Sequence, residues 1–129
     1  MEIKSKYFTY EELTYNSRGI TNIPNEEQLN NLQELVTNVL DPLRELYGKP
    51  IKINSGFRCT LVNEAVGGVN TSEHLKGYAA DITTQHDNKQ LYDLIRTHFK
   101  FRQLINESNF SWVHVSYNKK DLKMQLLKL

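Results

Sequence analysis

Three side chains with metal-binding chemistry stand out in the sequence. His74 and Asp81 lie seven residues apart in a glycine-flanked stretch, and His114 follows later between apolar residues. Two imidazoles and one carboxylate form the ligand set of an open zinc site, whose fourth position is left to water or substrate. A single histidine is more often a packed or surface side chain than a ligand, so these three residues alone only suggest a metal site.

The overall composition excludes several classes of protein. The 129 residues carry 16 basic and 15 acidic side chains, a formal net charge of +1, so no electrostatic footprint for nucleic acid or an anionic membrane is visible. Cys59 is the only cysteine, which excludes an internal disulfide and leaves nitrogen and oxygen as metal ligands. Because the N-terminus lacks the apolar core of a signal peptide, we expect a protein made in the cytoplasm without membrane insertion.

The hydrophobic pattern predicts one α+β domain over residues 1–129. Apolar residues recur at three- and four-residue steps from Leu29 to Tyr47, which predicts a long helix capped by Asn25. We expect Pro42 to kink this helix near Val39 or to divide it into two abutting helices. Further helices are predicted at 60–66 and from 88 to 99, and strands at 51–54, 79–83, 101–106 and 112–117.

The C-terminal segment is harder to assign. The apolar spacing over residues 123–128 fits either a strand or a helix. We favour another strand of the same antiparallel sheet, because the preceding turn is short and the strand at 112–117 needs a partner.

Three motifs surround the candidate ligands. They are Ser55 to Arg58 (SGFR), Ser72 to Ile82 (SEHLKGYAADI) and Trp112 to Tyr117 (WVHVSY). Together they resemble the M15 peptidases, a family of zinc D,D-carboxypeptidases and cell-wall endopeptidases. The resemblance is strongest to the short single-domain branch of this family found in phages and bacteria. The resemblance implies Zn²⁺ on His74, Asp81 and His114. It also implies a small antiparallel sheet packed on helices, similar to the zinc fold of hedgehog signalling domains.

The resemblance further implies residues that act beside the metal. Many members carry an acid three positions before the last histidine, where this chain has Ser111, so we assign the general base to Glu107 at the end of the preceding strand. The alternative for Glu107 is a solvated turn residue. Arg58 is expected to bind substrate and stabilise an oxyanion, unless it pairs with an acid such as Glu64. Ser72 either lies beside the substrate or caps the following turn.

The function implied by the resemblance is a zinc-dependent peptidase that hydrolyses peptidoglycan stem peptides through metal-activated water. It would act as a D-Ala-D-Ala carboxypeptidase or as an endopeptidase. The alternative is a zinc-containing, non-catalytic binding module or virion component, which the missing acid at Ser111 favours and Glu107 and Arg58 oppose. We expect a monomer without a nucleic-acid partner that reaches the cell wall after lysis, by export or as part of a phage particle.

Overall fold

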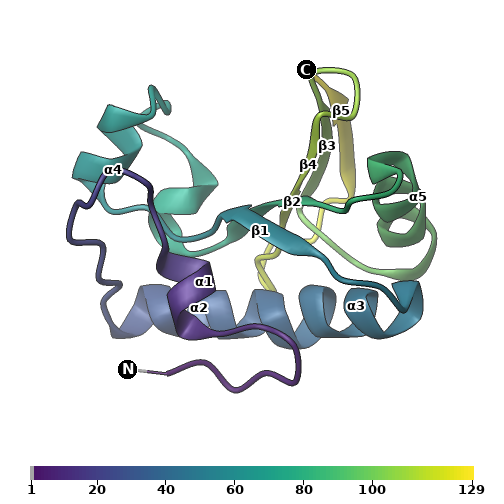
Figure 1. The fold of residues 1–129 in the computed structure, drawn as a ribbon, viewed down its shortest axis with the longest axis horizontal. Coiled ribbons are helices and arrows are strands. Elements are labelled where there is room, and N and C mark those ends of the chain that lie inside the picture. Colours follow the sequence, from purple (N-terminus) through teal and green to yellow (C-terminus); the bar gives the residue numbers. More distant parts are fainter. Residues whose placement is uncertain (1) are drawn as a thin grey trace.

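The structure is a computed structural model that describes residues 2–129. Its elements are, in chain order, α1 (Tyr10–Thr14), α2 (Glu26–Leu35), the π-helical segment η1 (Val36–Leu40), α3 (Asp41–Tyr47), β1 (Lys52–Ser55), α4 (Thr60–Ala65), the 3-10 helix η2 (Glu73–Lys76), β2 (Ala79–Thr83), α5 (Asn88–His98), β3 (Gln103–Glu107), β4 (Trp112–Ser116) and β5 (Gln125–Lys128). In Figure 1, α2 and α3 run along the base and the sheet rises above them, with α5 and α4 at opposite ends. Within the described part of the chain, no helix combines the length and the apolar character that a membrane span requires.

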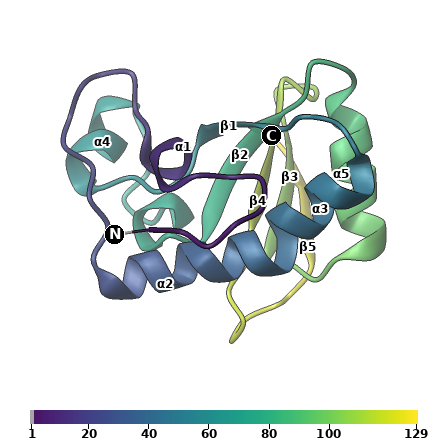
Figure 2. The same cartoon turned by 60° about the horizontal axis from the view of Figure 1, so that its bottom comes forward.

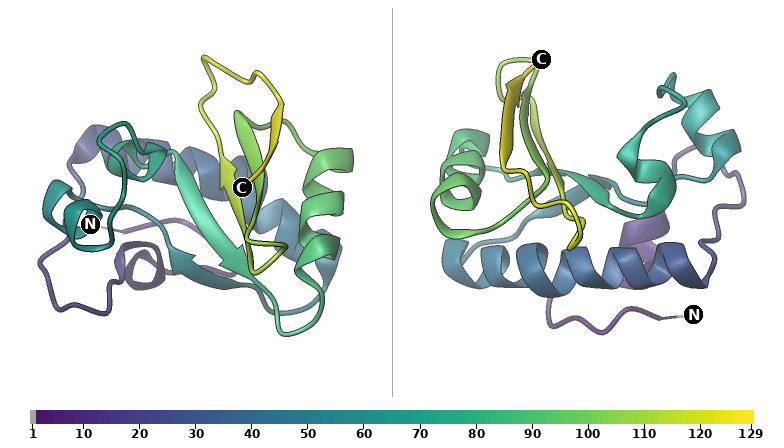
Figure 3. Two further views of the ribbon diagram at one scale, coloured as in Figure 1. Left: turned by 90° about the horizontal axis from the view of Figure 1, so that it is seen from above. Right: turned by 180° about the vertical axis from the view of Figure 1, so that it is seen from behind.

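Five strands form one sheet in the order β1-β2-β4-β3-β5. The strands β1, β2, β4 and β3 pair antiparallel, and Figure 3 shows them from above and from behind. Helices and strands occur close to every position that the hydrophobic pattern predicted. The α+β class, with a small sheet packed on helices, is therefore confirmed.

The last strand is present, but its predicted orientation is wrong. β5 runs parallel to β3, with Gln103 opposite Gln125 and Ile105 opposite Leu127. Both sides of β4 are occupied by β2 and β3, so β5 cannot pair with β4 and adds instead at the outer edge of β3. Because β3 and β4 are antiparallel, the chain that leaves the end of β4 meets the start of β3 and then follows it in the same direction.

The long helix adapts to Pro42 through a single π-helical segment. Proline cannot donate a backbone hydrogen bond, and its ring crowds the carbonyl of the residue four positions earlier. In η1 the helix widens, and the amide of Asp41 donates to the carbonyl of Val36, five residues back. The interruption predicted near Val39 is thus a π-turn, and α2 and α3 continue in one line (Figure 1).

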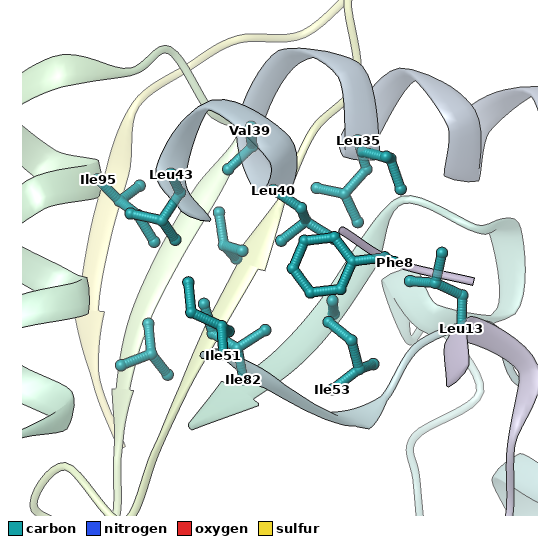
Figure 4. Close-up of a cluster of buried hydrophobic side chains, with 14 of the residues drawn as sticks. Phe8, Leu13, Leu35, Val39, Leu40, Leu43, Ile51, Ile53, Ile82 and Ile95 are labelled. Carbon is teal, nitrogen blue, oxygen red and sulfur yellow. The ribbon is translucent and has the colours of Figure 1, made fainter. Parts of the chain in front are cut away.

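The apolar face of this helix packs on the sheet and forms the core. Figure 2 shows α2 and α3 crossing the sheet, and Figure 4 shows Leu35, Leu40 and Leu43 directed toward Ile53 and Ile82. These five side chains are buried. Burial of each contributes roughly 1.5–3 kcal/mol. The core therefore holds β2, the strand that also carries the candidate carboxylate, firmly against the helix.

Candidate metal centre

His74, Asp81 and His114 come together in one buried cluster. Each offers one ligand atom, and these atoms all lie within 4.8 Å of one another. Asp81 on β2 and His114 on β4 are register partners on neighbouring antiparallel strands, so their side chains project from the same face of the sheet. The three side chains are therefore arranged as a shared metal site requires.

The turn that carries His74 is fastened to helix α2. The Ser72 hydroxyl accepts a hydrogen bond from the His74 amide at 3.2 Å, which caps the 3-10 helix. Gly77 ends it with φ +79°, and a Cβ at this position would lie 2.3 Å from the carbonyl oxygen of Gln28. The Gln28 side-chain amide in turn donates to the carbonyl of Leu75 at 3.1 Å. Close contact with α2 thus fixes the position of the turn that carries His74 relative to the sheet.

A backbone carbonyl orients the His74 ring. Its Nδ1 lies 2.7 Å from the carbonyl oxygen of Gly56. Since a carbonyl can only accept, Nδ1 carries a proton, which leaves Nε2 as the ring nitrogen that faces the cluster, 3.2 Å from Asp81 Oδ1. Gly56 itself approaches the backbone closely, because a Cβ there would lie 2.4 Å from the carbonyl oxygen of Leu13.

The His114 ring faces the cluster with its other nitrogen, Nδ1, whereas His74 faces it with Nε2. Its Nδ1 lies 3.1 Å from Asp81 Oδ1, and its Nε2 lies 2.9 Å from Glu73 Oε1. A carboxylate on Nε2 leaves Nδ1 as the atom that faces the cluster. Glu73 was not among the predicted site residues, because its neighbour in sequence is His74 and nothing local links it to His114, 41 positions later.

Arg58 approaches Asp81 from the side away from the histidines. Its Nη2 lies 3.3 Å from Asp81 Oδ2, its Nε donates to Ser55 Oγ at 2.9 Å and its Nη1 donates to Asn63 Oδ1 at 3.3 Å. The ion pair considered from the sequence, with Glu64, is not the one formed, because Glu64 is exposed on α4.

The electrostatics of the cluster favour positive charge. Burial disfavours the charged form of His114, but hydrogen bonds to Asp81 and Glu73 outweigh it and raise the pKa of His114 from 6.5 to about 9. Burial likewise opposes ionisation of Asp81, yet the two histidines hold the pKa of that carboxyl far below its usual range. A buried pocket that stabilises a cation in this way, with nitrogen and oxygen donors, fits Zn²⁺.

A cavity of about 590 Å³ opens over the cluster. The three candidate ligands line it together with Arg58, Ser72 and Glu107. A larger hollow of about 700 Å³, between α2 and the segment after β4, contains none of these six residues.

Glu107 lies at the end of β3, where the predicted base was placed. Its carboxylate is half-buried and, within residues 2–129, has no hydrogen bond or ion pair. The turn that follows is anchored by Asn88 of α5, whose side-chain amide donates to the carbonyl of Phe110 at 2.9 Å. Ser111 is exposed, outside the cavity, and its hydroxyl donates to the carbonyl of Ser108.

Comparison with known proteins agrees with this geometry. The sequence model of the family described as peptidase M15 matches residues 6–116, a range that includes every residue of the candidate centre. A zinc D-Ala-D-Ala carboxypeptidase of Streptomyces albus G is 46% identical over 44 residues. That match takes in 33% of this chain and 17% of the relative, about a sixth of its length. The family match covers most of the sequence, and the chain belongs to the peptidase M15 family.

Proposed function

We propose that this protein is a zinc-dependent peptidase that hydrolyses peptidoglycan stem peptides, either as a D-Ala-D-Ala carboxypeptidase or as an endopeptidase. The buried His74–Asp81–His114 cluster opens to a cavity that is also lined by Arg58 and by the Glu107 carboxylate, and this observation carries the proposal. The name of the Streptomyces relative supports the choice of substrate class.

Zinc held by His74, Asp81 and His114 would act as a Lewis acid, polarising a peptide carbonyl and lowering the pKa of water. Glu107 accepts the proton of the attacking water and returns it to the leaving nitrogen. Its carboxylate suits this role because no partner inside residues 2–129 occupies it and because it faces the cavity beside the cluster.

Arg58 holds the carbonyl oxygen of the substrate. A guanidinium has five N–H groups, and Asp81, Ser55 and Asn63 each take one. Two N–H groups are left for the substrate oxygen, on which negative charge develops as the peptide is attacked.

Ser72 serves both roles considered from the sequence. Its oxygen accepts from the His74 amide as a helix cap. Its hydroxyl hydrogen is then available to donate to substrate, since the side chain also lines the cavity.

We also infer that residues 1–129 work as one peptidase domain and as a monomer. One hydrophobic cluster takes in side chains from Phe8 to Val115, and one sheet joins the strands, which supports a single unit. Its target lies in the cell wall, reached after lysis, by export or in a phage particle.

A second candidate function is a zinc-containing binding module without catalysis. Ser111 occupies the position where many M15 members carry an acid, and its hydroxyl is engaged with a backbone carbonyl. This observation favours the alternative, whereas the Glu107 carboxylate, which has no partner among residues 2–129, opposes it.

Mass spectrometry of defined muropeptides distinguishes these functions. Zinc-loaded protein is incubated with pentapeptide and cross-linked muropeptides, with a chelated sample alongside. Chelator-sensitive loss of a terminal alanine identifies a carboxypeptidase, and splitting of a stem or cross-link identifies an endopeptidase. No product from a protein that holds one zinc per chain would favour the binding module.

A further inference from the structure

Glu73 links His114 to an arginine outside the metal cluster. Its Oε1 lies 2.9 Å from His114 Nε2, and its Oε2 lies 2.9 Å from Arg102 Nη1. The Glu73 side chain is 12% exposed, so these contacts replace most of its hydration.

The Arg102 guanidinium group also binds a second carboxylate, that of Asp121. Its Nε donates to Asp121 Oδ2 at 2.9 Å, and its side chain is 26% exposed. Asp121 lies between β4 and β5, so a chain of contacts leads from this connection through Arg102 and Glu73 to His114. Each link joins opposite charges or a carboxylate and an imidazole.

We propose that Glu73 and Arg102 are positioning residues for zinc: Glu73 holds His114 with Nε2 protonated and Nδ1 toward the metal, and Arg102 holds Glu73 in place. The inference rests on the zinc site of the proposed function but does not require that the protein hydrolyse a peptide. A histidine that ligates through one nitrogen needs its proton on the other, and a carboxylate on that proton fixes the ring and raises its basicity.

Glu73 does not act as the general base in this arrangement. Its carboxylate contacts Nε2, whereas the opposite ring nitrogen, Nδ1, faces Asp81 and the rest of the cluster. The imidazole ring therefore stands between Glu73 and the metal position, and Glu73 acts through His114.

The two positions have distinct energetic roles. Removal of Glu73 leaves His114 free to turn or to carry its proton on Nδ1, which competes with zinc. Removal of Arg102 keeps the Glu73 carboxylate but takes away the cation that holds it, so a smaller loss of zinc affinity follows.

The test measures zinc affinity by competition with a chromogenic chelator, on the full chain, for E73A, E73Q, R102Q and the double variant E73Q/R102Q. We expect E73A to weaken zinc binding by about 10- to 100-fold. E73Q and R102Q should weaken zinc binding by a smaller factor. The double variant should bind zinc no more weakly than E73Q alone, because Arg102 acts through Glu73. The control is D93N, which removes an exposed carboxylate of the Lys89–Asp93 pair on α5 and should leave zinc affinity unchanged.

Ring-nitrogen NMR gives a readout that a purely structural role would not move. Long-range proton–nitrogen spectra of the zinc-loaded wild type should show His114 protonated at Nε2, and this signature should be lost or exchange-broadened in E73A. If E73A does not fold, the near-isosteric E73Q decides. Zinc affinity of E73Q and R102Q within twofold of wild type would overturn the proposal. Tight zinc binding that depends on Glu73, without muropeptide cleavage, would instead overturn only the proposed peptidase function.

Discussion

Asp81 is shared between Arg58 and the metal cluster, one oxygen for each. Its Oδ2 lies 3.3 Å from Arg58 Nη2, whereas its Oδ1 lies 3.2 Å from His74 Nε2 and 3.1 Å from His114 Nδ1. Arg58 therefore fixes the carboxylate in the rotamer that directs Oδ1 into the cluster. The SGFR motif thus orients a candidate metal ligand and also lines the cavity above the cluster.

The first prediction concerns stability without metal. R58Q removes the cation that faces a buried carboxylate, and the unfolding free energy of the metal-free protein should fall by about 1–3 kcal/mol. Urea unfolding in the presence of chelator measures this. K6Q removes the cation of the exposed Lys6–Glu45 pair and should give no measurable change. An R58Q protein as stable as K6Q would mean that the ion pair with Asp81 contributes nothing.

The second prediction tests the proposed base. E107Q should lower kcat on a D-Ala-D-Ala pentapeptide by about 10²- to 10⁴-fold, because an amide cannot accept the proton of the attacking water. Zinc content should stay at one per chain, since within residues 2–129 Glu107 forms no hydrogen bond or ion pair with the three candidate ligands. E64Q, which changes an exposed glutamate on α4, is the matched control and should keep full activity. Unchanged turnover by E107Q would show that another group is the base.

The third prediction is the pH dependence of zinc binding. Burial lowers the pKa of His114, but hydrogen bonds to Asp81 and Glu73 outweigh this effect and raise the pKa from 6.5 to about 9. Zinc requires the neutral imidazole, so zinc displaces a proton below pH 9, and affinity should rise by about tenfold per pH unit between pH 6.5 and 8.5. Chelator competition across this range measures the slope.

The same raised pKa has a consequence for the metal-free fold. Its contribution to stability is fully present below pH 6.5 and is lost as the pH rises through about 9, because the folded state then releases the proton. Urea unfolding in chelator should therefore show lower stability at pH 9.5 than at pH 6. Flat profiles in both experiments would contradict the charge arrangement of the cluster.

The fourth prediction separates close packing from backbone strain. Gly77 and Gly48 have similar positive φ values, +79° and +76°, but only at Gly77 would a Cβ collide with backbone, the carbonyl of Gln28. Both G77A and G48A should lose about 1 kcal/mol or more from the left-handed conformation. G77A should lose clearly more, and should also weaken zinc binding because the turn that carries His74 must shift. Equal losses in the two variants would show that contact with α2 does not hold this turn.

Local patterns in the sequence were sufficient for most of the elements, and the motif resemblance named the three residues that the structure brings together as a candidate metal cluster. The capping box of Asn25 and Gln28 and the helical spacing that follows it depend on neighbours within four positions. Asp81 and His114 lie on short strands whose alternation is also local. The motifs around these residues therefore led to His74, Asp81 and His114 before any contact between them was known.

Contacts between distant segments decided the rest. The parallel pairing of β5 follows from its addition at the outer edge of β3, and no spacing within residues 123–128 encodes that edge. The contact of Glu73 with His114 and that of Arg58 with Asp81 join residues 41 and 23 positions apart. Which charges meet depends on how helix α2 and the sheet bring these segments together, because hydrogen bonds of about 3 Å depend on position in space and not on separation along the chain.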